Sequence, residues 1–355
     1  MRILHTSDWH LGRSFHRESL LAAQAAFVDH LVETVRAERV DVVAVAGDVY
    51  DRALPPVDAV ALLDEALARL RAAGARVVLI SGNHDSALRL RFGSALFEAA
   101  GVHVRTSPDQ SWEPVVVDDV AFYGIPYLEP ELVRAQWELP DRSHTAAITH
   151  AMTRIRADAA RHRASVVLSH CFVTGGQASD SERDISVGGV AHVPLTAFDG
   201  ADYVALGHLH GRQRMSETVR YSGSPLAYSF SEVGHVKGSW LVTLGEEVEF
   251  VPAPVPRPVG RLRGEIDDLL THPPATPPTR TTGCRSSSPT RCAPSPRWTG
   301  CAPASPTPSR CPSSPWAPSP PRSPYASAGG PRRRSHSTSL RRSAASLPHP
   351  RRKTC

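Results

Sequence analysis

The chain has 355 residues, of which 41% are hydrophobic, and a formal net charge of +5 at neutral pH. This length accommodates one large domain or two of ordinary size. The sequence has no run approaching the roughly 18 consecutive apolar residues of a membrane-spanning helix, and it enters a strand-like run at once, without a signal peptide. We therefore expect a cytoplasmic protein that makes no contact with a membrane.

The charge is unevenly distributed. Residues 271–355 contain 14 Arg or Lys and no acidic residue, which leaves residues 1–270 with 26 basic and 35 acidic side chains, a net charge of −9. Residues 1–270 therefore lack a general basic field, and any contact with DNA would come from local basic patches and bound metal ions. Cys171 is the only cysteine of this part. We expect a buried, reduced thiol there, with a metal ligand or a nucleophile as the alternatives.

In the first hundred residues, runs typical of buried strands alternate with stretches in which apolar side chains have helical spacing. In chain order these segments are 3–7, 20–35, 42–46, 56–73, 76–80 and 86–100. The β-α order predicts an α/β architecture with largely parallel strands.

After residue 101 the sequence predicts mainly short strands. They are expected at 102–104, 115–117, 121–125, 166–169, 203–206, 219–222, 239–244 and 247–251, the last three as antiparallel strands. A helix is expected over 143–162 and a mobile Gly/Ser-rich loop over 174–193. We therefore predict one domain over residues 1–268, a four-layer α-β-β-α sandwich of two sheets flanked by helices.

Residues 269–355 have a different character. Residues 271–355 contain 19 of the 32 prolines and almost no aliphatic periodicity. This composition is typical of a disordered segment. A product of GC-rich DNA translated in a shifted reading frame has the same composition, and resequencing the gene would distinguish the two.

Five of the predicted strands end in side chains that bind metals or move protons. The candidates are Asp8, His10, Asp48, Asn83, His84, His170, His208 and His210. Because open α/β sheets place their sites at the carboxyl ends of strands, we expect these side chains to form one rim. Oxygen and imidazole ligands without thiolate suit Mn²⁺, Fe or Zn²⁺, and eight groups suffice for two ions that share a carboxylate. Two such ions are the usual device for phosphoester hydrolysis.

Each motif alone also fits a structural role. Asp8 could cap a helix, Gly47–Asp51 could be an ordinary turn, and His208 and His210 could lie on a solvated loop. Their joint occurrence, each after an apolar strand, favours the functional interpretation.

The ordered motifs resemble those of the calcineurin-like metallophosphoesterases. More narrowly, Ile3–Gly12, Gly47–Pro56 and Tyr221–Glu232 resemble the SbcD-type nuclease subunits of SbcCD DNA-repair complexes. The resemblance implies one Mn²⁺ held by Asp8, His10, Asp48 and His210, and a second held by Asp48, Asn83, His170 and His208. It also implies that His84 stabilises or protonates the leaving 3′-oxygen and that Asp85 orients His84.

The resemblance further implies a 3′→5′ exonuclease and hairpin endonuclease of DNA repair and recombination, with DNA, an SbcC-type SMC-like ATPase and a second copy of the chain as partners. Apolar stripes over 56–73 and 86–100 would form part of the homodimer interface, or would only cover the sheet. The basic loop at Arg13, His16 and Arg17 would meet the phosphate backbone or solvent. The chain has no Gly-x-x-x-x-Gly-Lys-Ser/Thr loop, so ATP use would belong to the partner.

Residues 271–355 lack the capping and SbcC-docking patterns that the resemblance leads one to expect. Three alternatives therefore stay open. The chain could be a small-molecule phosphoesterase of the same fold, a truncated SbcD unable to dock its partner, or an inactive scaffold.

Overall fold

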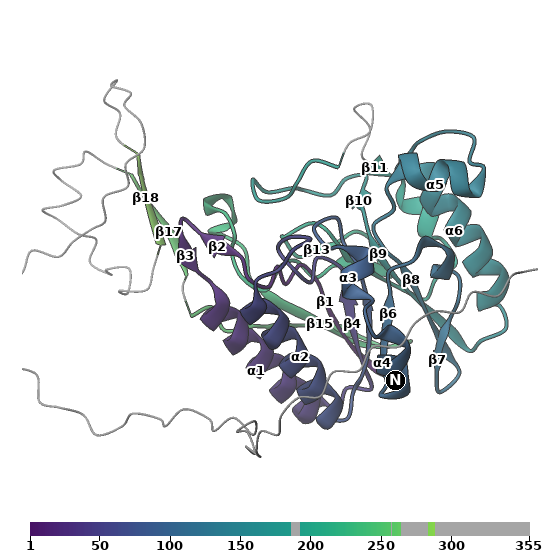
Figure 1. Cartoon of the computed structure of the whole chain (residues 1–355), viewed down its shortest axis with the longest axis horizontal. Coiled ribbons are helices and arrows are strands. Elements are labelled where there is room, and N and C mark those ends of the chain that lie inside the picture. Colours follow the sequence, from purple (N-terminus) through teal and green to yellow (C-terminus); the bar gives the residue numbers. More distant parts are fainter. Residues whose placement is uncertain (186–191, 257, 264–282, 288–355) are drawn as a thin grey trace, which may run out of the picture. The chain divides into compact units, whose positions relative to one another are not determined.

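The computed structural model describes residues 1–185, 192–256, 258–263 and 283–287, all of which belong to one compact unit, Met1–Cys292 (Figure 1). Of the predicted tail, only Gly283–Ser287 is described, as strand β18, which pairs in parallel with β17 (Val259–Arg263). The prediction for the rest of 269–355 lies outside the described residues, as does part of the predicted loop 174–193.

Two six-stranded mixed sheets form the centre of this unit. The strands of the first are, in spatial order, β16 (Val248–Pro252), β15 (Gly238–Thr243), β1 (Arg2–Thr6), β4 (Val42–Ala46), β5 (Arg76–Ile80) and β6 (Val102–Arg105). The strands of the second are β13 (Gln213–Arg214), β14 (Val219–Tyr221), β12 (Tyr203–Gly207), β9 (Ala164–His170), β8 (Val120–Ile125) and β7 (Val115–Val117). In the first sheet β1, β4, β5 and β6 are parallel, and β15 and β16 pair antiparallel at one edge. In the second sheet the strands from β14 to β8 are parallel, and β13 and β7 pair antiparallel at the two edges.

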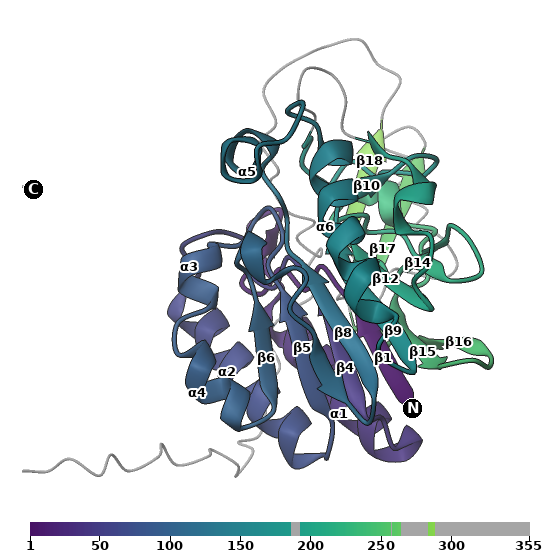
Figure 2. The same cartoon turned by 90° about the vertical axis from the view of Figure 1, so that its right-hand side faces the viewer.

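Helices cover the outer face of each sheet. The helices are α1 (Leu21–Glu38), α2 (Val57–Ala72), α3 (Ala87–Leu90), α4 (Ser94–Ala99), α5 (Pro130–Trp137) and α6 (His144–Ala159). Figure 2 shows the two sheets between α2 on one side and α6 on the other. None of the helices in the described part of the chain is long and apolar enough to cross a lipid bilayer.

Successive side chains of each strand pack on opposite faces of its sheet, and this alternation accounts for the layered architecture. Along β4, Val43 and Val45 pack in one core with α1 and α2, whereas Val42 and Ala44 pack in another with Val166 of β9 and the rest of the second sheet. Successive side chains of a strand point to opposite faces, so a strand buried on both faces reads as one continuous apolar run. The outer face of the second sheet forms a third core with α5 and α6. The predicted four-layer α-β-β-α sandwich is confirmed.

Several elements differ from the prediction. The helix expected over 86–100 is divided into α3 and α4, because Gly93 adopts a left-handed conformation (φ 74°) that interrupts the helix. β14 is antiparallel to β13 but parallel to β12, so its side of the sheet is not wholly antiparallel. The small elements that were not foreseen include α5, the hairpin of β2 (Ser14–Phe15) with β3 (Glu18–Ser19), and the pair β10 (Phe172–Val173) with β11 (His192–Val193).

Candidate metal centre

The eight predicted rim residues come together where the carboxyl ends of both sheets meet. Asp8 and His10 follow β1, Asp48 follows β4, and Asn83 and His84 follow β5. His170 ends β9, and His208 and His210 follow β12. Three overlapping groups have ligand atoms within 4.8 Å of one another: Asp8, His10 and His210; His10, Asp48 and His84; and Asp8, Asp48 and His170.

Asn83 connects the remaining members to these groups. Its Oδ1 lies 3.0 Å from Nε2 of His170 and 3.2 Å from Nδ1 of His208. His10 and His210 approach each other with their Nε2 atoms 3.0 Å apart. The structure thus gathers polar side chains from two different sheets, and from residues 8 to 210, into one buried cluster.

Close backbone packing makes this convergence possible. Gly82 follows β5 directly beside the Asp48 loop, where an added Cβ would lie 2.1 Å from Asp48 Oδ1 and 2.4 Å from Asp48 N. The backbone N–H of His84 donates to Asp48 Oδ1 at 2.8 Å. Only glycine at position 82 leaves room for the carboxylate to lie between the two loops.

Four of the clustered residues have left-handed backbone conformations. The φ angles are 53° at Asp8, 45° at His10, 49° at Asp48 and 103° at His208. Positive φ is uncommon for residues other than glycine, and such conformations cost about 1–3 kcal/mol each. They turn the chain sharply after each strand, so that the side chains point back over the sheet edge.

Main-chain carbonyls select the tautomers of two imidazoles. Nδ1 of His170 lies 2.9 Å from the carbonyl oxygen of Ala46, and Nδ1 of His84 lies 2.8 Å from that of Asp51. Because a carbonyl oxygen only accepts, both Nδ1 atoms carry the proton, which leaves Nε2 of each neutral ring with its lone pair. This is the form in which a neutral imidazole binds a metal ion or receives a proton. For His170 this lone pair faces Asn83 Oδ1 at 3.0 Å, so the two acceptor atoms can share a cation but not a hydrogen bond.

The role that the resemblance assigns to Asp85 needs correction. Its carboxylate accepts hydrogen bonds from the backbone N–H groups of Val49, Tyr50 and Gly82, at 2.8–3.0 Å. Among the described contacts, the hydrogen-bond partner of the His84 ring is instead the Asp51 carbonyl. Asp85 therefore fixes the Asp48 loop against the Gly82 loop and does not hold His84 directly. The position of Asp85 next to His84 in the sequence did not indicate that its carboxylate would bind backbone N–H groups and not the His84 ring.

The electrostatics of the cluster favour a bound cation. Burial, followed by the nearby charge of Asp48, raises the pKa of Asp8 well above its ordinary value. Burial and the neighbouring imidazoles lower the pKa of His10 and His208 well below the ordinary value, so both rings are neutral. Two buried carboxylates beside neutral imidazoles form a donor set that fits divalent metal ions, which would neutralise the repulsion between the acids.

Several polar residues around the cluster were missed from the sequence. Ser7 donates to Asp8 at 2.5 Å, and Ser181, Glu182, Glu232 and Lys237 surround His210. Glu232 and Lys237 are buried although they are charged. Charged residues in an irregular stretch have no periodicity that marks burial, so the sequence offers no direct signal for them.

Cys171, next to His170, is a free thiol with 1% of its surface exposed. Burial raises the pKa of this thiol to about 12. The expectation of a buried, reduced cysteine is confirmed.

Known proteins provide an independent comparison. The family model of the calcineurin-like phosphoesterases matches residues 1–212. Among solved structures, the chain is similar to TT1561 of Thermus thermophilus (14% identity, 71% of this chain and 99% of that chain covered, TM-score 0.44). It is also similar to a dimetal phosphatase from Danio rerio (15% identity, 72% and 97% covered, TM-score 0.43).

Proposed function

Because the chain belongs to the calcineurin-like phosphoesterase family, we propose that it is a DNA nuclease that hydrolyses phosphodiester bonds with two divalent metal ions, of which Mn²⁺ is the first choice. The family consists of phosphoester hydrolases that bind two divalent metals, and the cluster of Asp8, Asp48 and the surrounding imidazoles is the observation that carries the proposal. When bound, the two ions supply Lewis-acid activation of the phosphoester and of the attacking water.

The described contacts divide the clustered residues into two sets of metal ligands that share one carboxylate. Asp48 Oδ2 lies 3.6 Å from Nε2 of His10 and 3.6 Å from Nε2 of His170, one residue from each proposed ligand set, so Asp48 is the candidate to bridge the two ions. Asp8, His10 and His210 would complete one ligand set. Asn83, His170 and His208 would complete the other.

His84 would act on the leaving group. Its Nδ1–H is held by the Asp51 carbonyl, and its Nε2 lies 3.9 Å from Asp48 Oδ2, at the edge of the cluster. From there Nε2, once it has taken up a proton, would donate it to the 3′-oxygen as the phosphodiester bond breaks.

The preference for DNA is supported by the stretch Tyr221–Glu232 and by the loop after His10. Tyr228 packs edge-on against both His10 and His210, and its hydroxyl donates to the Trp9 carbonyl at 2.6 Å. The guanidinium of Arg13 lies 4.7 Å from the centre of the Tyr228 ring, beside the cluster. A cation there suits a phosphate backbone. We propose 3′→5′ cleavage at double-stranded ends and endonucleolytic cleavage of hairpins.

The test compares two substrates. Purified chain with Mn²⁺ is incubated with a labelled DNA hairpin and with bis-p-nitrophenyl phosphate, beside Asp48→Asn, His84→Ala and the control His30→Ala on α1. Hydrolysis of both substrates by wild type and the control, lost with Asp48→Asn and, for DNA, with His84→Ala, is expected. Hydrolysis of the small diester alone would favour a small-molecule phosphoesterase or a chain that cannot grip DNA. No hydrolysis of either, with metal bound, would refute the proposal.

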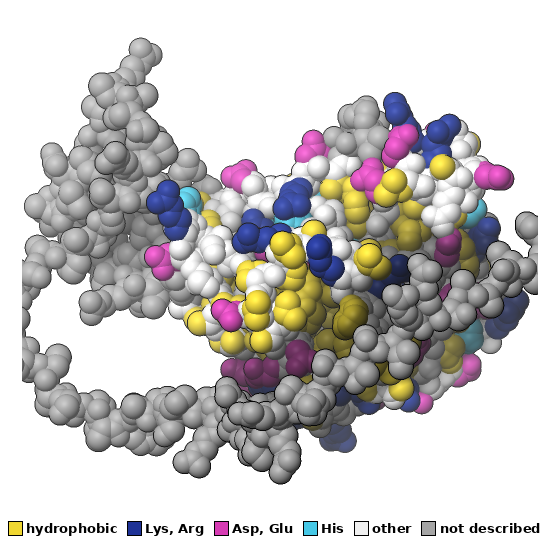
Figure 3. All heavy atoms as spheres, viewed as in Figure 1, with side chains coloured by type: hydrophobic (Ala, Val, Ile, Leu, Met, Phe, Trp, Pro, Cys, Tyr) yellow, Lys and Arg dark blue, Asp and Glu magenta, His cyan; other side chains and the backbone are white. Residues whose placement is uncertain are grey.

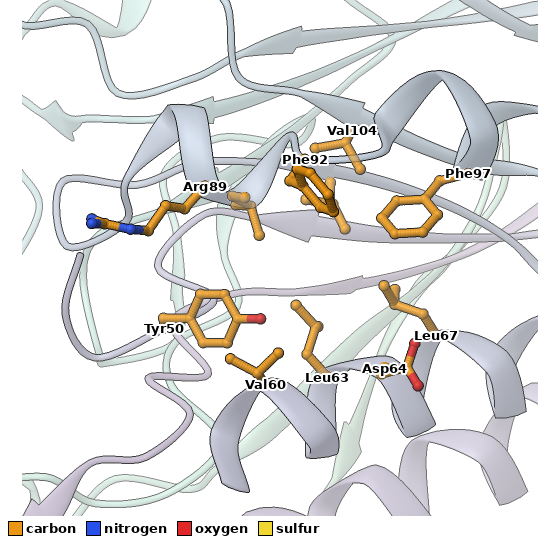
Figure 4. Close-up of a pocket in the computed structure, with 11 residues that line it drawn as sticks. Tyr50, Val60, Leu63, Asp64, Leu67, Arg89, Phe92, Phe97 and Val104 are labelled. Carbon is orange, nitrogen blue, oxygen red and sulfur yellow. The ribbon is translucent and has the colours of Figure 1, made fainter. Parts of the chain in front are cut away.

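We also propose that a second copy of the chain covers an apolar surface formed by α2, α3 and α4. Its exposed side chains are Val57, Val60, Leu88, Phe92, Leu96 and Phe97. Figure 3 shows hydrophobic side chains gathered on this face. Between the helices lies a cavity of about 150 Å³, with Leu63 and Leu67 on one side and Phe92 and Phe97 on the other (Figure 4). A two-fold dimer would bury the same patch on both copies.

Sedimentation velocity tests this dimer. Phe92, 83% exposed, is replaced by Glu, and Leu132, 71% exposed on α5, is replaced by Glu as the matched control. We expect a dimer for wild type and Leu132→Glu, and a monomer for Phe92→Glu because the charge would be buried between copies. A dimer of unchanged affinity in Phe92→Glu would contradict the proposal.

Docking of an SbcC-type ATPase is the remaining part of the proposal. Residues 271–355 lack the docking pattern, so we expect this chain to hold such a partner weakly. A pull-down with the ATPase measures this directly. The expectation would be contradicted if this chain retained the ATPase as strongly as a related chain that has a full docking segment.

A further inference from the structure

His210 is held at three points by side chains that come from two distant segments. Its backbone N–H donates to Glu182 Oε1 at 2.7 Å, and its carbonyl oxygen accepts from Lys237 Nζ at 2.9 Å. Its ring atom Nδ1 lies 2.6 Å from the hydroxyl of Ser181. No other imidazole of the cluster has such a set of side-chain partners among the described contacts.

The next contact of Ser181 determines where the protons lie. Its hydroxyl is 2.7 Å from Oε1 of Glu232, whose carboxylate also accepts from the backbone N–H of Tyr228 at 3.0 Å and pairs with the ammonium of Lys237. A carboxylate beside an ammonium group is ionised and only accepts, so the single proton of Ser181 points to Glu232. The Ser181 oxygen must then accept a proton from Nδ1–H of His210.

Ser179 does not change this assignment. Its hydroxyl lies 2.8 Å from the Ser181 oxygen and 2.7 Å from Glu182 Oε2. The Ser179 hydroxyl has its own proton, which it can donate to the Ser181 oxygen or to Glu182 Oε2. The hydrogen bond from Ser181 to Glu232 is unaffected.

We propose that Ser181 and Glu232 form a hydrogen-bond relay that fixes His210 in its Nδ1–H tautomer and so presents the Nε2 lone pair to the metal centre. Both are positioning residues, and the value of the relay for metal binding rests on the proposed function. Main-chain carbonyls do the same for His170 and His84 and cannot be removed by substitution. His210 is therefore the ligand whose tautomer can be changed by altering one hydroxyl.

Long-range ¹H–¹⁵N spectra of histidine-labelled, metal-free chain test the relay directly. The spectra distinguish the two tautomers of each neutral ring, and His210→Asn assigns the signal. We expect His210 to be protonated at Nδ1 in wild type. Ser181→Ala should give a mixture of tautomers, and Ser181→Thr, which keeps the hydroxyl, should restore the wild-type signal. His210 protonated at Nε2 in wild type would overturn the proposal, whatever the Ser181 variants show.

Mn²⁺ titration calorimetry provides the second measurement. Outer partners of metal-binding histidines typically change affinity by about 10- to 100-fold, so we expect a loss of that size for one of the two ions in Ser181→Ala, with recovery in Ser181→Thr. Ser239→Ala is the control, because Ser239 is buried and its hydroxyl has no hydrogen-bond partner among the described residues. Its affinity should equal that of wild type.

The two measurements separate the relay from the proposed function. Unchanged Mn²⁺ affinity in Ser181→Ala, with wild type binding two ions, would overturn the role of the relay in presenting Nε2. A wild-type chain that binds no divalent ion, but in which His210 is protonated at Nδ1, would leave the relay standing and defeat the metal-centre proposal.

Discussion

Gly207→Ala should separate the two sheets at the metal centre. Gly207 is the last residue of β12 and faces the end of β4 in the other sheet, where an added Cβ would lie 1.9 Å from the carbonyl oxygen of Ala46 and 3.0 Å from Nδ1 of His170. Real Cβ atoms essentially never come closer than 3.0 Å to such a neighbour. The backbones must therefore move apart by at least about 1.1 Å, because a carbonyl oxygen cannot rotate away as the end of a long side chain can.

The size of the expected loss in Mn²⁺ affinity follows from the cluster residues that come directly after β4 and β12. Asp48 lies two residues beyond Ala46, and His208 follows Gly207 directly, so a displacement of about 1.1 Å is transmitted to both. Metal–ligand distances tolerate changes of only about 0.2 Å, and we expect Mn²⁺ affinity to fall by at least about 100-fold. Overpacking of this kind costs about 1–3 kcal/mol of unfolding free energy, so the protein should still fold.

Urea unfolding in EDTA and Mn²⁺ titration measure the two effects separately. Gly234→Ala is the control, because a Cβ at Gly234 meets no atom within 4 Å. It should leave affinity unchanged and alter stability by less than about 1 kcal/mol. Wild-type Mn²⁺ affinity in Gly207→Ala would refute the reasoning, since it would mean that the sheet edges need not be in contact for the site to form.

Three further predictions concern stability. Mn²⁺ at about 100 times its dissociation constant should stabilise wild type by about 2.7 kcal/mol in thermal unfolding, and Asp48→Asn should lose most of this shift; equal shifts would contradict the ligand role of Asp48. Burial lowers the pKa of His5 to about 3, so below about pH 6.5 the unfolded chain binds one more proton than the native chain at this site. As the pH is lowered from about 6 to 4, the unfolding free energy of wild type should therefore fall by up to about 1.4 kcal/mol per pH unit more than that of His5→Gln, as measured by urea unfolding. Parallel pH profiles of the two proteins would exclude a neutral, buried His5. Ser143→Ala removes the acceptor for the backbone N–H of Ala146 at the start of α6 and should cost about 1 kcal/mol in urea unfolding, and an unchanged midpoint would show that water replaces this cap.

The strands that carry the cluster could be predicted because they are buried on both faces. Val42–Ala46 and Arg76–Ile80 are almost continuous apolar runs, and the metal-binding types of residue begin shortly after each run ends. Parallel strands bring their carboxyl ends to the same edge of a sheet, so the convergence of Asp8, Asp48 and Asn83 in the first sheet followed from the order of elements. That His170 and His208 of the second sheet join them depends on how the two sheets pack together, which the order of elements does not give.

Other features depend on contacts that no local pattern carries. The pairing of β14 with β12 is decided by neighbours across the sheet. The relay of Ser181 with Glu232 joins residues 51 positions apart in irregular segments. Short polar segments of this kind have no periodicity, so only the folded chain reveals which of their charges are buried.

The left-handed backbone at four cluster residues bears on how this protein would respond to laboratory evolution. Selection for heat resistance alone, without a demand for catalysis, would reward the exchange of Asp8, His10, Asp48 and His208 for glycine or asparagine, residues that adopt positive φ more readily. Variants that survive heating best would thus be enriched in chains that no longer bind metal. A thermostability screen of this protein therefore needs a test of metal binding or activity in every round, because the positions most open to improvement are the proposed metal ligands.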